Sequence, residues 1–498
     1  MTPEAPRRGW THHHFCVFLL TFFSYAFFHV TRKTFSNVKV SLSVQWTGTP
    51  TNESTGTLYP PEVWSAHQLF PDENNASLFL GALDTIFLFS YAVGLYISGY
   101  LGDRFNLRLV LTLGMCSSAI VVLVFGSVTE WLGFYSMPFY AVMWAVNGLL
   151  QSTGWPCVVA IMGNWFGKDS RGLVFGLWSA CASVGNILGA LLVSGVLRFG
   201  YEYAFLVTAC CLFASGIVVF FGLVSSPLEV GLPAPDCAED GAGESVNCAE
   251  AVEQTTLLGD PVSPAPALGF FQAVCLPGVA LYSLAYACLK LVNYSFFFWL
   301  PFYLSGHFGW SEADADRMSI WYDVGGIIGG AAGGLVSDRL GKRAPIITLM
   351  LVLATGSLVG YKYSPNNKSV NGLLMGVTGF FVGGPANLIS SAVSADLGRQ
   401  GPVQGNQEAL ATVTGIVDGT GSLGASAGQF LVAVIKNKLG WGWVFYLFIL
   451  MTLLTIVCLL PLVIREVREL IASSRVRRDN TGAAAAAAGL LMDGSSVS

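Results

Sequence analysis

The sequence predicts an all-α polytopic membrane protein with about twelve transmembrane helices in two pseudo-symmetric six-helix halves. Of its 498 residues, 53% are hydrophobic and only 11% are charged, and the mean hydropathy is +0.60. Soluble globular domains carry about 25% charged residues. The apolar residues gather in about twelve stretches near the ~20 residues that a helix needs to cross a bilayer. Together these observations exclude a soluble fold.

The N-terminal half, residues 15–224, contains the first six stretches. They cover residues 15–36, 78–100, 107–127, 135–160, 171–195 and 203–224. A polar loop over residues 41–77 separates the first two and carries two N-glycosylation sequons, which begin at Asn52 and Asn75. We therefore expect this loop to lie in the lumen or outside the cell, with both asparagines as glycan acceptors.

The C-terminal half, residues 270–464, contains the other six stretches. They cover residues 273–303, 320–337, 344–362, 371–393, 409–432 and 441–464. A third sequon, at Asn367, falls between the third and fourth of them, on the same side as the polar loop. This agreement in sidedness supports the arrangement and makes Asn367 a further candidate acceptor.

Basic residues outside the expected spans fall on the other side. They include Arg7, Arg8, Arg104, Arg108, Lys168, Arg171, Arg339, Lys342, Arg343 and Arg399. By the positive-inside rule this side is cytosolic, so we expect both the N-terminus, residues 1–14, and the tail, residues 465–498, in the cytosol. The tail ends in alanines and serines, and we expect it to be disordered.

A segment over residues 225–269 is rich in proline, alanine, glycine and acidic residues, which predicts a flexible cytosolic linker between the halves. It contains Glu253 four residues before Leu257 and Leu258. This acidic dileucine pattern is of the kind that sorts proteins to endosomes and lysosomes. A chance match in a linker is an equally good explanation.

The first span carries ionisable residues inside its apolar run. Tyr25, His29 and Arg32 follow at helical spacing and form one stripe. Ionisable groups in a span usually face a cavity or a partner, so the stripe predicts a path for an anion. In the alternative, Arg32 and Lys33 mark a helix end and reach the lipid headgroups.

The stripe has a counterpart in the seventh span, in the same apolar context. Its residues are Tyr286, Lys290 and Asn293. An internal repeat of this kind predicts that the two helices face each other across a central site. We expect Lys290 to be the cation that the seventh span contributes to substrate binding; in the alternative, it pairs with Asp418 and never contacts substrate. Asp418, near the middle of the eleventh span, balances the basic residues.

Three further acidic residues fall near expected span ends, where helix caps or gate ion pairs are the simplest roles. They are Asp84, Asp323 and Glu408. Two copies of a glycine, aspartate and arginine motif follow the second and eighth spans and predict gating contacts on the cytosolic face. The residues concerned are Asp103, Arg104, Asp338 and Arg339.

The fourth and fifth spans carry Asn147-Gly148-x-x-Gln151-x-x-Gly154-Trp155-Pro156 and then Asn164-Trp165-Phe166. With the two loop motifs, this series resembles the organophosphate:phosphate antiporter family of the major facilitator superfamily. The segments 31–38 and 290–294 are similar to those of the eukaryotic sugar phosphate exchangers. The resemblance runs from Phe15 to about Ile464 and implies a secondary transporter of the endoplasmic reticulum.

The resemblance also implies a pair of arginines, one each from the first and seventh spans, that clamps phosphate, with a histidine from the fifth span in bacterial relatives. This chain matches only Arg32: Asn293 occupies the second arginine position, and Ala182 falls near the histidine position. We therefore expect a carrier of small phosphate- or phosphonate-bearing anions with little glucose 6-phosphate exchange. The alternatives are a glucose-6-phosphate:phosphate antiporter and a transporter-like receptor that moves no substrate.

Nothing in the sequence forms a set of nucleophile, base and orienting residue, and no nucleotide or metal motif is present. We expect no enzymatic activity, no cofactor, no metal and no nucleic-acid partner. The expected partners are the anionic substrate and membrane lipid, and an accessory membrane subunit is left open.

Overall fold

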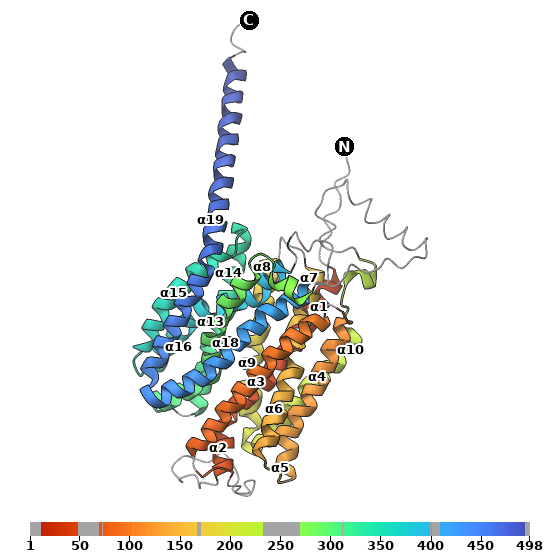
Figure 1. Ribbon diagram of the computed structural model, residues 1–498, viewed down its shortest axis with the longest axis vertical. Helices are drawn as coiled ribbons and strands as arrows, with labels where there is room; N and C mark the ends of the chain where they lie inside the picture. The colour runs from red at the N-terminus through yellow and green to blue at the C-terminus, as the bar shows by residue number, and fades with distance from the viewer. Residues whose placement is uncertain are drawn as a thin grey trace.

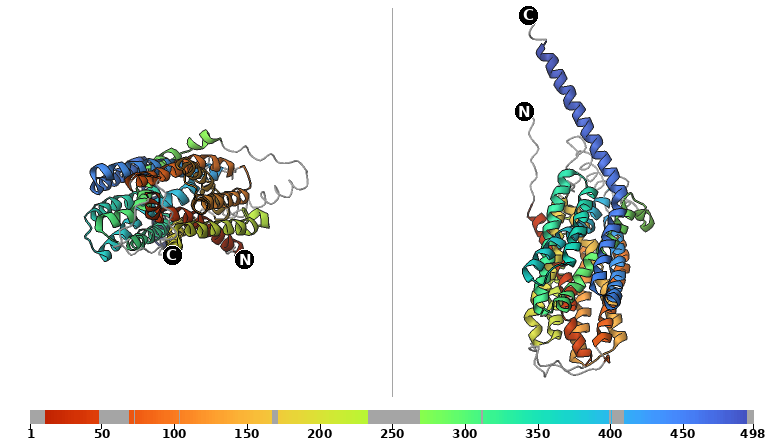
Figure 2. Two further views of the ribbon diagram at one scale, coloured as in Figure 1. Left: turned by 90° about the horizontal axis from the view of Figure 1, so that it is seen from below. Right: turned by 90° about the vertical axis from the view of Figure 1, so that its left-hand side faces the viewer.

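The computed structural model describes residues 11–47, 69–71, 73–102, 104–166, 171–232, 269–310, 312–398, 400 and 409–493. In this part of the chain the helices form two bundles that stand side by side (Figures 1 and 2). The start of α1 (His12–Asn37) and the extension of α19 (Trp441–Asp493) lie at one end of the molecule, and α2 (Lys39–Thr47) lies at the other. We refer to these as the α19 end and the α2 end.

The N-terminal bundle begins with α1 and α2 and continues through α10. Its further elements are α3 (Glu73–Gly102), α4 (Leu107–Leu123), η2 (Val124–Val128), α5 (Thr129–Trp131), α6 (Met137–Gln151), α7 (Gly154–Trp165), α8 (Arg171–Trp178), α9 (Ala180–Val196), η4 (Leu197–Phe199) and α10 (Tyr201–Gly222). The expected fourth span is interrupted at residues 152–153 and the fifth at residue 179. Helix α2 occupies the start of the expected polar loop.

The C-terminal bundle follows a short turn, η5 (Pro227–Val230). Its elements are α12 (Phe270–Val274), α13 (Val279–Phe308), α14 (Glu312–Leu340), α15 (Ala344–Lys362), α16 (Lys368–Leu388), η7 (Ile389–Val393), α17 (Ser394–Leu397), α18 (Ala409–Leu439) and α19. Helix α14 starts eight residues before the expected span, so Asp323 lies well inside it and the prediction of a span-end position was wrong.

Helix α19 continues through the tail, so the prediction of a disordered tail was wrong as far as Asp493. Its run of alanines, residues 483–488, consists of the strongest helix former. Arginines and leucines in the same tail also favour helix over coil. Figure 1 shows this part of α19 projecting away from both bundles.

Nine helices among the described residues are long and apolar enough to cross a membrane. The other three expected spans are the α6 and α7 pair, α14 and α18. The first is divided into two short helices, and the other two are rich in glycine, with several aspartates in α14 and several serines and threonines in α18. Polar spans of this kind line a cavity instead of facing lipid, and both α14 and α18 contribute to the site described below.

The two bundles meet along two helix pairs: α3 packs along α18, and α14 packs along α8 and α9. Glycines allow the first pair to approach closely. A Cβ added at Gly99 would lie 2.7 Å from the carbonyl oxygen of Ala411, and one added at Gly415 would lie 2.5 Å from that of Leu95. The bundles therefore contact each other through small residues, which suits two rigid halves that rock against each other.

Candidate functional site

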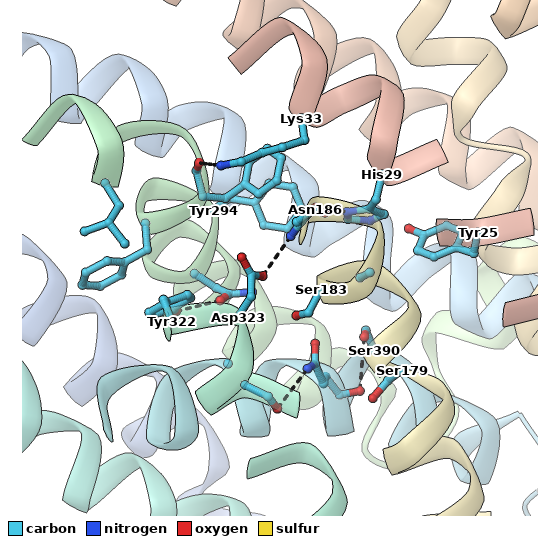
Figure 3. A pocket seen from close by; sticks show the side chains of 18 of the residues that line it. Tyr25, His29, Lys33, Ser179, Ser183, Asn186, Tyr294, Tyr322, Asp323 and Ser390 are labelled. Carbon is cyan, nitrogen blue, oxygen red and sulfur yellow. Dashed lines mark hydrogen bonds between the residues drawn. The ribbon is translucent and has the colours of Figure 1, made fainter. Parts of the chain in front are cut away.

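A polar cavity lies between the two bundles, because residues of both line it (Figure 3). Helices α1, α7, α9, α13, α14, α16 and α18 and the π-helical turn η7 contribute to its wall. Serines, asparagines and tyrosines make up much of the lining. Its ionisable members among the described residues, tyrosines aside, are His29, Lys33, Asp323 and Asp418.

Arg32 does not itself line this cavity, but its guanidinium carbon lies 5.8 Å from the ring centre of Tyr25, which does. Arg32 is only 4% exposed, so the alternative in which it reaches the lipid headgroups is wrong. Its Nε donates a 2.6 Å hydrogen bond to Oε1 of Gln151, whose Nε2 in turn donates to Oγ1 of Thr31 at 3.1 Å. Its two terminal nitrogens, Nη1 and Nη2, have no hydrogen-bond partner among the described residues. A buried guanidinium held on one edge and unsatisfied on the other is costly unless an acceptor occupies the open edge.

Two tyrosines extend this arrangement toward the other bundle. The hydroxyl oxygens of Tyr25 and Tyr91 lie 3.3 Å apart. The guanidinium carbon of Arg32 is 4.4 Å from the centre of the Tyr91 ring, and Nζ of Lys290 is 5.7 Å from the same centre. The Tyr91 ring thus lies close to the two buried cations of opposite bundles and contributes a cation–π interaction to each.

Lys290 is fully buried and does not line the cavity. Its Nζ donates hydrogen bonds to Oδ1 of Asp418 at 2.7 Å and to Oγ of Ser422 at 2.8 Å. Asp418 and Tyr286 do line the cavity, and Nζ of Lys290 lies 5.3 Å from the Tyr286 ring. The structure therefore brings together the ion pair considered in the sequence analysis, with its carboxylate on the cavity side.

His29, Asn186 and Asp323 form a chain across the cavity, from α1 through α9 to α14. Nδ2 of Asn186 donates to Oδ1 of Asp323 at 3.0 Å, and Oδ1 of Asn186 lies 3.0 Å from Nδ1 of His29. An ionised carboxylate can only accept, so the amide nitrogen must face Asp323 and the amide oxygen must face His29. The neutral histidine therefore carries its proton on Nδ1 and leaves Nε2 as an acceptor.

On the C-terminal side of the cavity, Asn293 accepts a 2.7 Å hydrogen bond from the hydroxyl of Tyr322. Asn293 thus lines the site, as its place in the repeat predicted, but its acceptor oxygen is already engaged. Trp155 bridges the bundles by donating from Nε1 to the carbonyl oxygen of Ser390 at 3.0 Å. Ser390 belongs to η7, and π-helical turns are frequent at functional sites.

Toward the α2 end, lysines of the N-terminal bundle contact aromatic residues of α13. Nζ of Lys33 lies 4.9 Å from the Phe297 ring and 3.5 Å from its carbonyl oxygen. Lys39, which forms an ion pair with Asp84, lies 5.2 Å from the Phe298 ring. Lys33 and Phe297 line the cavity, whereas Lys39 and Phe298 do not and join α2 to α13 outside its lining. Asp84 belongs to an ion pair as expected, but it lies well inside α3, so the prediction of a span-end position was wrong for it as well.

At the α19 end, the second loop motif forms an ion-pair network. Nη1 of Arg343 donates to Oδ1 of Asp338 at 2.6 Å, and its Nε donates to Oδ2 of Asp396 at 3.0 Å. Arg339, the arginine of this motif for which we expected a gating contact, is exposed. In the first motif Arg104 stacks 4.0 Å from the Tyr100 ring.

The remaining sequence candidates lie away from the cavity or outside the described residues. Asn75, in the first turn of α3, and Asn367, which caps α16, are both exposed. The side-chain oxygen of Asn367 accepts from the backbone N–H of Val370. Candidates outside the described residues are Asn52, Asp103, Glu253, Leu257, Leu258 and Glu408.

The cavity residues that were not selected as site residues from the sequence include Lys33, Asn186 and Asp323. Lys33 was interpreted with Arg32 as a helix end, yet it is 4% exposed. Asn186 is the lone amide in a glycine-rich apolar stretch, and that isolation was the available signal. Asp323 was assigned to a span end because the start of α14 is polar.

The comparisons with known proteins agree with this architecture. The model of the Major Facilitator Superfamily matches residues 15–406. Sugar phosphate exchanger 3 of Bos taurus is 64% identical over 95% of this chain and 99% of that protein. Putative glycerol-3-phosphate transporter 5 of Arabidopsis thaliana is 39% identical over 95% of this chain and 96% of that protein.

Among solved structures, the proton:xylose symporter XylE bound to 6-bromo-6-deoxy-D-glucose superposes with a TM-score of 0.63. The match covers 90% of this chain and 95% of that one at 14% sequence identity. At this identity the likeness concerns the fold alone.

Proposed function

Because the chain belongs to the major facilitator superfamily and, within it, to the family of the sugar phosphate exchangers, we propose that it carries small phosphate- or phosphonate-bearing organic anions across an organelle membrane. The two bundles rock about the central cavity, so that the anion binds from either side in turn. The chain is a transporter of this superfamily, and no feature of the described residues favours an enzyme or a receptor that moves no substrate.

The observation that carries the proposal is the open edge of the Arg32 guanidinium. Nη1 and Nη2 are buried, lack partners among the described residues and belong to a side chain fixed by Gln151. A guanidinium presents two parallel N–H donors that match two oxygens of a phosphate or phosphonate. An oxyanion at this edge would satisfy both nitrogens and neutralise the charge.

The rest of the cavity suits the organic part of such an anion. Hydroxyl and amide groups of Ser183, Ser390, Asn293 and Asn387 line it and can exchange hydrogen bonds with a polyol or similar group. A glucose-6-phosphate:phosphate antiporter is the second candidate, because the relatives include sugar phosphate exchangers. It is disfavoured because Asn293 stands where the resemblance implies a second arginine.

The test is counterflow in proteoliposomes loaded with inorganic phosphate, with radiolabelled glycerol 3-phosphate, glucose 6-phosphate and a phosphonate outside. We expect the wild type to take up glycerol 3-phosphate or the phosphonate faster than glucose 6-phosphate, and Arg32→Ala to take up none of them. Arg198→Ala is the matched control, because Arg198 also lies over an aromatic ring, Phe199, but is exposed. Normal counterflow by Arg32→Ala would overturn the assignment.

We place the α19 end in the cytosol and the α2 end in the lumen. The positive-inside pattern supports this, as does the exposure of Asn75 and Asn367 at helix starts away from the basic loops. Replacing Asn52, Asn75 and Asn367 singly by glutamine should increase gel mobility if each carries a glycan. Unchanged mobility for all three would contradict the assigned sidedness.

For location we propose both the endoplasmic reticulum membrane, which the family resemblance implies, and the endosomal and lysosomal membrane, which the dileucine pattern implies. Replacing Leu257 and Leu258 together with alanine should deplete the lysosomal pool in fractionated cells. Glu253→Ala should weaken sorting less. An unchanged distribution would show that the pattern is a chance match.

A further inference from the structure

We infer that Asp323 binds a proton that travels with the anion, so that the protein is a proton–anion symporter driven by a pH gradient. The inference rests on the proposed function and adds its coupling ion. Three observations carry it: the position of Asp323 between the bundles, the hydrogen-bond chain that it ends, and the balance of charges in the cavity.

Asp323 is placed where a coupling proton has to bind. Its side chain lines the cavity and is partly exposed there, so that water in the cavity can reach it. Its hydrogen bond from Asn186 crosses from α14 of one bundle to α9 of the other. A change in the charge of Asp323 therefore acts directly on a contact between the two moving parts.

The hydrogen-bond chain makes this contact sensitive to a proton. Ionised Asp323 accepts from the amide of Asn186, which fixes the amide oxygen toward His29 (Figure 3). A protonated Asp323 becomes a donor, so it weakens its hold on the amide nitrogen and favours a reoriented amide. Protonation thus loosens the bridge between α9 and α14 and allows the bundles to separate there.

The net charge around the cavity matches a phosphate dianion when one proton is bound with it. Three cations and two carboxylates lie in or against it, namely Arg32, Lys33, Lys290, Asp323 and Asp418. With His29 neutral, their sum is one positive charge. A phosphate monoester carries about −1.5 to −2 charges at pH 7. Neutral Asp323 brings the sum to two positive charges and so matches the dianion.

The other charged groups near Asp323 fit this role. Lys33 of α1 is the cation that interacts electrostatically with Asp323. His29 of α1 reaches it only through Asn186, and the nearest titratable group on its own helix is Tyr322. The neighbouring α13 and α16 present the neutral Asn293 and Asn387 to the cavity among the described residues. Protonation of Asp323 therefore leaves the charge of Lys33 for the incoming anion.

The other carboxylates are poorer candidates. Asp418 is already paired with the buried ammonium of Lys290 at 2.7 Å, so its carboxylate is engaged in a fixed contact within its own bundle. Asp84 is paired with Lys39 and does not line the cavity. In the cycle, a water molecule on the acidic side protonates Asp323, the neutral acid and the anion cross together, and Asp323 returns its proton to water on the other side. Nothing else is consumed.

The experiment uses the purified full chain in proteoliposomes with the membrane potential clamped by potassium and valinomycin. Labelled glycerol 3-phosphate and inorganic phosphate are the probes. The first measurement is counterflow at equal pH on both sides. The second is net uptake with the outside at about pH 5.5 and the inside at about pH 7.5, and the third is alkalinisation of the outside medium. For the wild type we expect the gradient to raise net uptake at least about fivefold, with alkalinisation of the medium.

For Asp323→Asn we expect the gradient to lose its effect and alkalinisation to disappear, with counterflow slower but measurable. Asp323→Glu should retain both. Asp314→Asn is the matched control, because Asp314 is a carboxylate on the same helix that pairs with Lys368 at the surface. If Asp323→Asn shows no flux at all, calorimetry at about pH 7.5 in two buffers decides: the wild type should take up a proton on binding inorganic phosphate, and the variant none.

The outcomes separate the inference from the proposed function. Absence of counterflow by the wild type for every phosphate anion overturns the function itself. Counterflow that no pH gradient drives overturns the proton symport and leaves the function. If gradient-driven uptake survives in Asp323→Asn but is lost in His29→Gln, the proton-binding group is His29, and the assignment to Asp323 is overturned.

Discussion

The two equivalent stripes of the internal repeat are built alike but are charged differently. Each places a tyrosine, a basic residue and a third polar residue on the first membrane-spanning helix of its bundle. The residues are Tyr25, His29 and Arg32 on α1, and Tyr286, Lys290 and Asn293 on α13. In each stripe the middle residue contacts the fifth span of its own bundle: His29 meets Asn186 on α9, and Lys290 meets Asp418 on α18.

The stripes differ in whether their polar groups have ion-pair and hydrogen-bond partners. On α13, Lys290 is neutralised by Asp418, and Asn293 accepts from Tyr322. On α1, Arg32 donates to Gln151 and lies beside the Tyr91 ring, and its two terminal nitrogens lack hydrogen-bond partners among the described residues. The two copies of the repeat thus differ: the stripe on α1 supplies the unbalanced charge that attracts an anion, and the stripe on α13, with Lys290 paired to Asp418, is neutral and hydrogen-bonded.

The largest expected effect comes from removing the unbalanced charge. Arg32→Met should lower the initial rate of glycerol 3-phosphate counterflow by roughly a hundredfold or more, because truncating a buried charged partner costs about 2–5 kcal/mol of binding. Its thermal stability in detergent should stay the same or rise, since an unsatisfied buried guanidinium is replaced by an apolar chain. A large loss of stability would show that Arg32 is a structural residue, and the comparison of the two stripes would fail.

Replacing Lys290 should have the opposite pattern of effects: a large loss of stability and little direct loss of substrate affinity. Lys290→Met leaves Asp418 buried without its cation and should lower the free energy of unfolding by about 3–5 kcal/mol. Asp418→Asn in the same background should restore much of it, and the double-mutant cycle measures this coupling. Weak coupling, with a fall in substrate affinity for Lys290→Met alone, would instead place Lys290 in direct contact with the anion.

The smallest expected effect is a change of selectivity from making the stripes more alike. Asn293→Arg, combined with Tyr322→Phe to remove the hydroxyl that Asn293 now accepts from, introduces a second guanidinium opposite Arg32. We expect the rate ratio of glucose 6-phosphate to glycerol 3-phosphate to rise by about tenfold, the size of one charge-assisted contact. Competition assays on the double variant and on Tyr322→Phe alone provide the measurement and its control. An unchanged ratio would mean that position 293 does not select the substrate.

Sequence reasoning found the architecture because apolar length and the repeat are local properties. The stripe that contains Arg32 could be predicted from the sequence because a guanidinium inside an apolar run is rare. The partners of the stripe were less visible. Asn186 and Asp323 acquire their roles only when α9 and α14 meet across the bundles, a contact between residues 137 positions apart.

Helix boundaries explain the other differences. The first turns of α14 are polar, so the span expected from hydropathy begins eight residues after the helix itself does. Asp323 therefore lies near the end of the expected span but well inside the helix. In the second loop motif the ion pair with Asp338 is made by Arg343, which comes within reach because the chain turns at Gly341, whose φ is +66°.

The extension of α19 gives the transporter a lever. From Arg465 to Asp493 the helix rises about 43 Å at ~1.5 Å per residue. Its base is tied to the start of α15 through two contacts: Glu466 accepts from the backbone N–H of Ala344, and Glu469 pairs with Lys342. A small rotation of the C-terminal bundle is therefore magnified at the far tip. A dye near Asp493 and a second dye at the start of α1 would turn each transport cycle into a change of distance that single-molecule fluorescence can follow.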